Sequence, residues 1–296
     1  MYRKILYPTK FEEFSIDVLS YVLNFKKVGT EEIILLHVID ADPLTHATNI
    51  KKLVKSANTK MQQALKVIED SGLKAKKRIE VGVPYKEILK VADNERVSLI
   101  VSGRQKKGIF GEIFIGSTTD KVIRYGHFPV YVPKYPATFL EDKKACERLC
   151  ERVFHKILYP TDWSDCAEIA SKYLRGLKDA GVEEVVVAHV MDEKAMRLQP
   201  ADRFKEFKEI DQKKLELIRQ DIGMEGIKVK THLHVGKAGT DLIKIAQEED
   251  VSLIIMGSHG KGYVEGMLWG SVSRNVVEYS DRPVLLIKSP QCLERI

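Results

Sequence analysis

The sequence lacks the long apolar segments that membrane proteins require. No apolar run reaches the roughly 18 residues of a transmembrane helix, so no such helix is expected. The N-terminal segment MYRKILYPTK has no apolar stretch after its basic residues, so it does not read as a secretory signal. These two absences predict a cytoplasmic protein without a membrane partner.

Cysteine is scarce, and its spacing matches no zinc-binding or disulfide framework. The four cysteines are Cys146, Cys150, Cys166 and Cys292. His232 and His234 would share one face of a strand, but no carboxylate or third ligand lies close to them in sequence. We interpret the histidine pair as part of a polar strand face, and we expect no metal site built by the protein.

The excess of positive charge is small. Lysine and arginine number 48 against 42 aspartates and glutamates, which gives a formal net charge of +6 over 296 residues. We take this excess to be spread along the chain, whereas nucleic-acid binding requires a clustered basic face. No nucleic-acid partner is therefore expected.

An internal repeat divides the chain into two halves. The segment KILYPT at 4–9 returns at 156–161, and VSLI at 97–100 returns at 251–254. A period this long indicates a duplicated domain rather than a solenoid unit, and the length is about twice that of a typical ~150-residue domain. We expect one domain over residues 1–136 and another over 153–296, joined by a charged linker helix over 137–152.

Each half alternates strand and helix patterns. Ile33–Val38 is a continuous apolar run, typical of a strand covered on both faces. Ile50–Ser71 has the periodicity of a long amphipathic helix, which Gly72 closes. Five strands alternating with four helices predict an α/β fold with a parallel sheet and right-handed crossovers. In such sheets ligands bind at the carboxyl ends of the strands.

A glycine-rich loop in the second half carries the strongest functional signal. The apolar strand Ser252–Met256 leads into Gly257 and Gly260, and Gly270 then precedes a helix that starts at Ser271. A helix N-terminus offers unpaired N–H groups and the positive end of the dipole to a phosphate, and glycine lets a ligand approach the backbone. The spacing is neither a P-loop nor a dinucleotide fingerprint. A flexible surface loop is the alternative interpretation.

The spacing Gly257-x2-Gly260-x9-Gly270-Ser271 resembles the nucleotide-binding motif of the universal stress protein family, G-x2-G-x9-G-[S/T]. The resemblance covers nearly all of both halves. It implies two tandem Rossmann-like domains of the adenine nucleotide alpha hydrolase type, each with five strands in the order 3-2-1-4-5. It also implies that the two domains pair within the chain through their fifth strands, Val130–Val132 and Val284–Ile287, and leaves a further homodimer open.

For the second half, the resemblance implies a site for ATP or another adenine nucleotide, with Mg or Mn as an accompanying ion. An acidic side chain at a strand end, as in Asp162, can accept hydrogen bonds from ribose hydroxyls, and Val190 would meet adenine through its backbone. Met256 would line the base or sugar pocket. Gly257, His259 and Gly260 would wrap the sugar and phosphates, and the helix start would hold phosphate through N–H groups and two hydroxyls. The full set is Pro160, Thr161, Asp162, Val190, Met256, Gly257, His259, Gly260, Gly270, Ser271, Val272 and Ser273.

The first half departs from this pattern at two positions. Lys10 stands where Asp162 stands, and Lys106 stands where Gly260 stands, so a weakened or empty site is expected there. No catalytic residue is assigned. The expectation is a non-enzymatic stress or signalling protein with one competent site. A slow ATP hydrolase on the same fold and an interaction module that binds no nucleotide remain the alternatives.

Overall fold

The computed structural model describes residues 1–10, 14–40, 47–103, 105–106, 113–134, 152–260 and 269–288. The chain divides into two compact units, Met1–Pro133 and Lys134–Ile296. The linker helix expected at 137–152 lies outside the described residues except for Arg152, as do Cys146, Cys150 and Cys292. Within the described part of the chain, no helix combines the length and the apolar character needed to cross a membrane.

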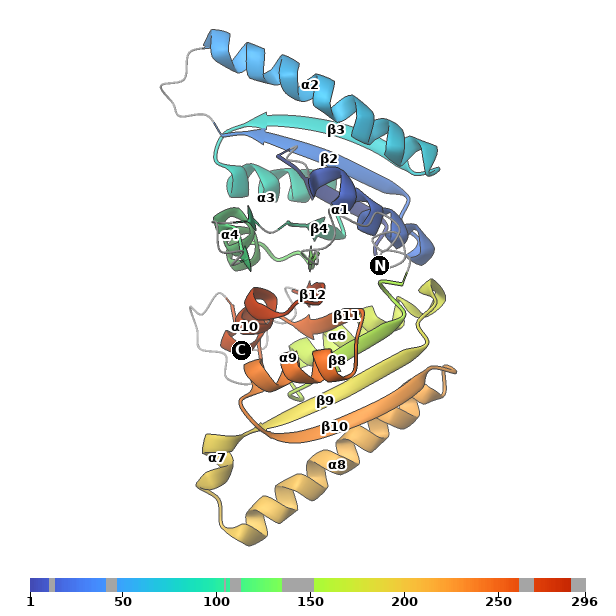
Figure 1. Cartoon of the computed structure of the whole chain (residues 1–296), viewed down its shortest axis with the longest axis vertical. Coiled ribbons are helices and arrows are strands. Elements are labelled where there is room, and N and C mark those ends of the chain that lie inside the picture. Colours follow the sequence, from blue (N-terminus) through green and yellow to red (C-terminus); the bar gives the residue numbers. More distant parts are fainter. Residues whose placement is uncertain are drawn as a thin grey trace. The chain divides into compact units, whose positions relative to one another are not determined.

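The first unit is an α/β domain (Figure 1). Its elements are β1 (Lys4–Pro8), α1 (Phe14–Leu23), the 3-10 helix η1 (Asn24–Val28), β2 (Glu32–Ile39), α2 (Ala47–Asp70), β3 (Lys74–Val81), α3 (Pro84–Glu95), β4 (Leu99–Val101), β5 (Gln105–Lys106), β6 (Ile113–Phe114), α4 (Ser117–Tyr125) and β7 (Val130–Val132). The parallel strands follow the order β3-β2-β1-β4-β7. The short antiparallel pair β5–β6 was not expected.

The second unit repeats this architecture. Its elements are β8 (Lys156–Pro160), α6 (Asp165–Arg175), the 3-10 helix η3 (Lys178–Ala180), β9 (Glu184–Asp192), α7 (Glu193–Arg197), α8 (Ala201–Gly223), β10 (Lys228–Gly236), α9 (Ala238–Glu248), β11 (Leu253–Gly257), α10 (Ser271–Tyr279) and β12 (Val284–Ile287). The parallel strands follow the order β10-β9-β8-β11-β12. Both units therefore have the expected order 3-2-1-4-5.

In the second unit, the strand register leaves a gap between the carboxyl ends of two central strands, β8 and β11. Strand β8 pairs with β9 along its whole length, from Lys156 to Pro160. It pairs with β11 only at Ile157 and Leu158, so the two strands separate toward their carboxyl ends. Strand β8 is also the point where the strand order reverses, which is the usual ligand position in open α/β sheets.

Helix α6 begins differently from the sequence-based expectation. The sequence predicts Asp165 and Glu168 as the capping pair, but the N-cap is Ser164, whose hydroxyl accepts a hydrogen bond from Ala167 N at 3.2 Å. Asp165 and Glu168 lie in the first turn, where their negative charge suits the helix dipole. Asp162 is therefore not the N-cap of α6, and its Oδ1 accepts a hydrogen bond from Ser164 N at 3.1 Å.

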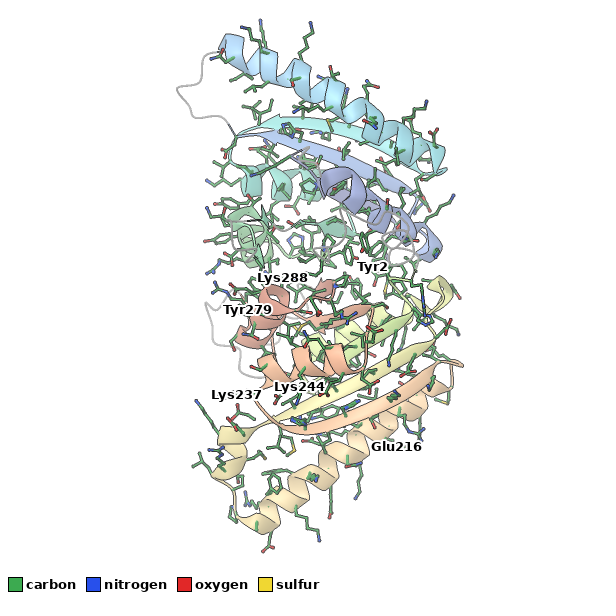
Figure 2. The ribbon with its side chains drawn as sticks, in the orientation of Figure 1. Tyr2, Glu216, Lys237, Lys244, Tyr279 and Lys288 are labelled. Carbon is green, nitrogen blue, oxygen red and sulfur yellow. The ribbon has the colours of Figure 1, made fainter. Side chains whose placement is uncertain are left out.

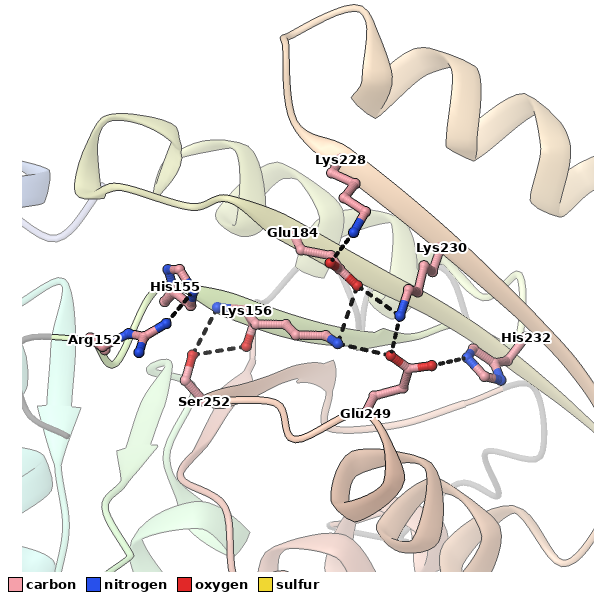
Figure 3. A network of polar contacts seen from close by, with 9 residues as sticks. All are labelled: Arg152, His155, Lys156, Glu184, Lys228, Lys230, His232, Glu249 and Ser252. Atoms are coloured by element: carbon pink, nitrogen blue, oxygen red, sulfur yellow. Dashed lines mark hydrogen bonds and ion pairs between the residues drawn. The ribbon is translucent and has the colours of Figure 1, made fainter.

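A network of charged side chains ties together the amino ends of β8, β9 and β10 (Figure 3). Lys156 Nζ lies 3.2 Å from Glu184 and 2.8 Å from Glu249, and Lys230 Nζ contacts the same two carboxylates. Hydrogen bonds from Lys156 and Lys230 lower the pKa of Glu249 to about 2. The first unit has a matching network around Glu95. These contacts lie at the opposite ends of the strands from the gap.

Candidate functional site

A cavity of about 290 Å³ lies at the carboxyl ends of the central strands of the second unit. Its size is close to the lower end of the range for small-molecule pockets, about 300–1,000 Å³. The structure brings all of the sequence-predicted site residues to its wall: Pro160, Thr161, Asp162, Val190, Met256, Gly257, His259, Gly260, Gly270, Ser271, Val272 and Ser273. They come from β8, β9, β11 and the start of α10, which are distant in sequence.

Four further residues line the cavity that sequence reasoning missed: Ala167, Ala188, Ala238 and Leu242. They are small or apolar, so they form an apolar wall rather than a polar contact. Ala188 could have been found from its place two residues before Val190. Ala238 and Leu242 belong to α9, and only the packing of that helix places them at the site.

The side chain of Asp162 leaves no room for a side chain at position 260. A Cβ atom on Gly260 would overlap Asp162 Oδ2 and lie 3.3 Å from its Cγ. The φ angle of Gly260 lies outside the left-handed region, so its backbone conformation does not by itself require glycine. The position requires glycine because the carboxylate occupies the space of a side chain.

The other two glycines of the motif are also packed against neighbouring atoms. A Cβ on Gly257 would lie 2.9 Å from both the carbonyl carbon and the Cβ of Cys166 at the start of α6. A Cβ on Gly270 would lie 3.0 Å from Ser258 O. In the first unit, Gly103 occupies the position of Gly257, yet a Cβ there would meet no atom of the described residues within 4 Å.

The start of α10 presents unpaired donors to the cavity. Gly270 N donates to Ser258 O at 3.0 Å, which anchors the loop. Within the described residues, the N–H groups of Ser271, Val272 and Ser273 have no acceptor, and the first turn carries no acidic residue. A helix N-terminus of this kind suits an anion such as phosphate.

The Ser273 hydroxyl has a different role from the expected one. It is buried, donates to Ser258 O at 2.7 Å and lies 3.0 Å from Gly270 O. Its proton is therefore used to fix the loop and is not available to a phosphate. The Ser271 side chain is exposed, so one hydroxyl, rather than two, is free to reach a ligand.

His259 is buried at the cavity wall. It is 5% exposed, and its Nδ1 lies 2.8 Å from Ser258 Oγ. The sequence alone also allows a solvent-facing loop histidine at this position, and the burial of His259 excludes that interpretation.

A cluster behind the cavity holds the segment that carries Asp162. His189 Nδ1 lies 2.7 Å from Thr161 O, and its Nε2 lies 3.2 Å from Asp211 on α8. The Trp163 ring stacks at 4.8 Å from the His189 ring, and Trp163 has a φ of 64°. A bulky residue in this conformation is strained, and such strain concentrates at functional sites. Thr161 and Trp163, which flank Asp162 in the β8–α6 turn, are thus held by contacts outside the cavity.

Both tryptophans of the chain lie next to cavity residues. Trp163 follows Asp162, and Trp269 precedes Gly270. The indole nitrogen of each is buried and has no hydrogen-bond partner in the described part of the chain.

The cavity's residues fit an adenine nucleotide. The apolar wall suits a base, the Asp162 carboxylate is an acceptor for sugar hydroxyls, and the N–H groups of α10 suit phosphate. Among the described residues, no cluster of three or more acidic, histidine or cysteine side chains is arranged for a metal ion.

Comparison with known proteins gives the same family for both halves of the chain. The sequence profile of the Universal stress protein family matches residues 1–134 and 154–288. The universal stress protein MJ0577 of Methanocaldococcus jannaschii is 37% identical over 155 residues, which cover 46% of this chain and 96% of that protein. A universal stress protein of Mycolicibacterium smegmatis is 23% identical over 247 residues, 82% of this chain and 80% of that protein.

A solved structure is similar over almost the whole chain. The crystal structure of a universal stress protein from Archaeoglobus fulgidus has a TM-score of 0.75 and 29% sequence identity, with coverage of 97% of this chain and 96% of that one. The similarity extends through both halves of the repeat.

Proposed function

Because the chain belongs to the universal stress protein family and contains its domain twice, we propose that it is an adenine-nucleotide-binding protein with one competent site. The site is the cavity of the second unit, and ATP is the proposed ligand. The observation that carries this proposal is the convergence of all the motif residues on one cavity. In the proposed organisation, residues 1–136 and 153–296 are the two domains and 137–152 the linker.

The proposed roles follow from the chemistry of each wall. Val190, Met256 and Leu242 supply apolar surface for the base, and Asp162 accepts hydrogen bonds from the ribose. The N–H groups at the start of α10 hold phosphate, which also benefits from the helix dipole. A magnesium or manganese ion would be held mainly through the phosphates, as is usual for Mg²⁺ with nucleotides.

The first unit is proposed to bind nucleotide weakly or not at all. Lys10 replaces the ribose acceptor there, and its side chain is exposed. The equivalent of Ser273, Thr119, again bonds inside its loop, with Thr119 Oγ1 donating to Gly103 O at 2.8 Å. The first unit therefore keeps the loop hydrogen bond of Thr119, but the positively charged Lys10 stands where the second unit has the carboxylate of Asp162.

The protein is proposed to act by binding rather than by turnover. Phosphoryl transfer requires a positioned nucleophile and charge neutralisation, and the motif residues supply binding contacts without an assigned base. The two domains are further proposed to pair through β7 and β12, each of which stands last in the strand order of its unit. An experimental structure with the two domains apart would contradict this pairing.

Mass spectrometry of small molecules released from the purified protein, followed by calorimetric titration of the stripped protein, tests the proposal. We expect an adenine nucleotide in the released fraction and one ATP bound per chain. Gly260→Lys should abolish most of the binding because its side chain enters the space of Asp162 and the phosphates. Lys106→Gly alone should restore little binding in the first unit, because Lys10 remains.

Gly223→Lys is the matched control, since it adds the same side chain at an exposed glycine of α8 with no atom within 4 Å of the new Cβ. Failure of the parent protein to bind ATP, two equal sites per chain, or unchanged binding by Gly260→Lys would contradict the proposal.

A further inference from the structure

The positive charge of the chain is not spread evenly, contrary to the expectation from composition. Residues 1–133 contain 22 lysines and arginines against 15 acidic residues, whereas residues 134–296 contain 26 against 27. The first unit therefore has a net charge of +7 and the second of −1. The whole excess belongs to one copy of a duplicated domain, so the shared fold does not require it.

Much of this charge lies on the outer face of α2. Lys51, Lys52, Lys55 and Lys66 are all exposed, and at about 100° per residue they fall within roughly a third of the helix circumference. The helix contains only two acidic residues, Glu69 and Asp70, at its C-terminal end. Among the described residues, none of the four lysines has an ion-pair partner. In Figure 2, some of the α2 side chains project from the side of the helix that faces away from the sheet.

This charge pattern does not serve the stability of the helix. Three of the five lysines lie in its N-terminal half and both acidic residues lie at its C-terminus, which is opposite to the preference of the helix dipole. Lys51 and Lys55 are four residues apart, a spacing at which like charges repel.

Helix α8 occupies the same place in the second unit and has six basic and six acidic residues. Arg219, for example, pairs there with Glu216 at 2.6 Å (Glu216 is labelled in Figure 2). The unpaired lysines of α2 are thus suited to an external anion.

We propose that the outer face of α2 binds the phosphate backbone of a nucleic acid without reading its sequence. Within this sector of the helix, the residues between the lysines include the neutral, hydrogen-bonding Thr59, Gln62 and Gln63, all exposed, and side chains of these types commonly accompany lysine at phosphates. Lys60 is also exposed but falls outside the sector. Lys51 to Lys66 span about 22 Å at 1.5 Å per residue, which is about six base pairs of a duplex at 3.4 Å each.

A membrane surface fits this face less well than a nucleic acid does. Helices that lie in a lipid interface present a broad apolar face to it. On α2 the apolar side chains point to the sheet, with Ala57, Met61 and Ile68 buried, and the one large apolar residue that is exposed is Leu53. The face offers charge and hydrogen bonds rather than apolar surface.

Filter binding with a labelled 20-base-pair duplex of arbitrary sequence tests the proposal. If four lysines each neutralise one phosphate, affinity should fall about 150-fold between 50 and 200 mM KCl, because the logarithmic slope is about −0.9 per contact. The quadruple variant Lys51→Gln, Lys52→Gln, Lys55→Gln, Lys66→Gln should lose more than tenfold in affinity at 50 mM KCl. The double variant Lys52→Gln, Lys55→Gln should reduce the slope by about 1.8, and it provides the test should the quadruple variant fold poorly.

The matched control removes the same charge from the equivalent helix of the second unit, through Lys205→Gln, Lys208→Gln, Lys213→Gln and Arg219→Gln. It should bind the duplex within about twofold of the parent protein. Equal losses in the α2 and α8 variants, no binding of the duplex at 50 mM KCl, or lysine-dependent binding to phosphatidylglycerol vesicles without duplex binding would each overturn the proposal. None of these residues lines the nucleotide cavity, so the outcome is separate from that of the ATP titration.

Discussion

Replacing Gly260 by alanine probes the most crowded glycine position of the proposed nucleotide site. The new Cβ would overlap Asp162 Oδ2, so the carboxylate has to move. Asp162 Oδ1 is held by Ser164 N at 3.1 Å, and movement therefore takes the carboxylate away from the ribose. Loss of a hydrogen bond to a charged group costs about 1.5–3 kcal/mol, which is roughly 10- to 150-fold in the dissociation constant of ATP. Calorimetric titration measures this constant directly.

A double-mutant cycle shows whether the effect passes through Asp162. Asp162→Ala alone should weaken ATP binding by a similar factor, and the combination with Gly260→Ala should be no weaker than Asp162→Ala within about twofold, because the two changes remove one shared interaction. Gly103→Ala is the control, since its Cβ meets no atom within 4 Å in the part of the chain that the structure describes. Unchanged affinity in Gly260→Ala, or two losses that simply add, would refute the reasoning.

Further predictions concern stability. Gly257→Ala should cost about 1–3 kcal/mol of unfolding free energy, because overpacking against Cys166 has no free space to relax into, whereas Gly103→Ala should be nearly neutral in the same urea titration. Glu249→Gln should destabilise the protein at neutral pH, and the difference from the parent should shrink as the pH falls from about 4.5 to about 2. The pKa of Glu249 is lower in the folded state, so its ionised carboxylate stabilises the fold at pH values above the unfolded pKa of 4.5, and this stabilisation is lost as the pH falls toward the folded pKa of about 2. A stability difference that stays constant over this pH range would argue against this ion-pair network. ATP at 100 times its dissociation constant should add about 2.7 kcal/mol to the stability of the domain that binds it, seen as a raised melting temperature, and multiple turnovers per second would instead favour an enzyme.

Local and repeated signals in the sequence were sufficient for the α/β class and the duplication, whereas the strand order within each sheet came from the resemblance to the family. The strands and helices follow from apolar periodicity, and the duplication of KILYPT and VSLI sets two copies of the same order. The register between β8 and β11, which opens the gap, could not be predicted because it depends on packing across the sheet. Helix α7 and the β5–β6 pair were missed because their sequences are short and lack periodicity.

The lining of the candidate cavity was more predictable than the contacts within it. Motif spacing identified the residues around Gly257 and Gly270, and the structure places them at one cavity. The reason for Gly260 depends on Asp162, which is almost 100 residues away in the sequence, and the role of Ser273 depends on the carbonyl of Ser258. Contacts of this kind arise only when the chain is folded. The basic face of α2 was missed because composition was averaged over both units.

The placement of the two tryptophans gives the protein a built-in optical probe. Trp163 and Trp269 adjoin opposite ends of the proposed ligand, at Asp162 and Gly270, and the chain has no other indole. Intrinsic fluorescence excited selectively at the indole band therefore reports on the surroundings of this one cavity, without a label. Trp163→Phe would leave an emission signal from the phosphate end alone, and Trp269→Phe one from the sugar end. Stopped-flow emission traces of the two variants would show in which order the two ends of a nucleotide bind.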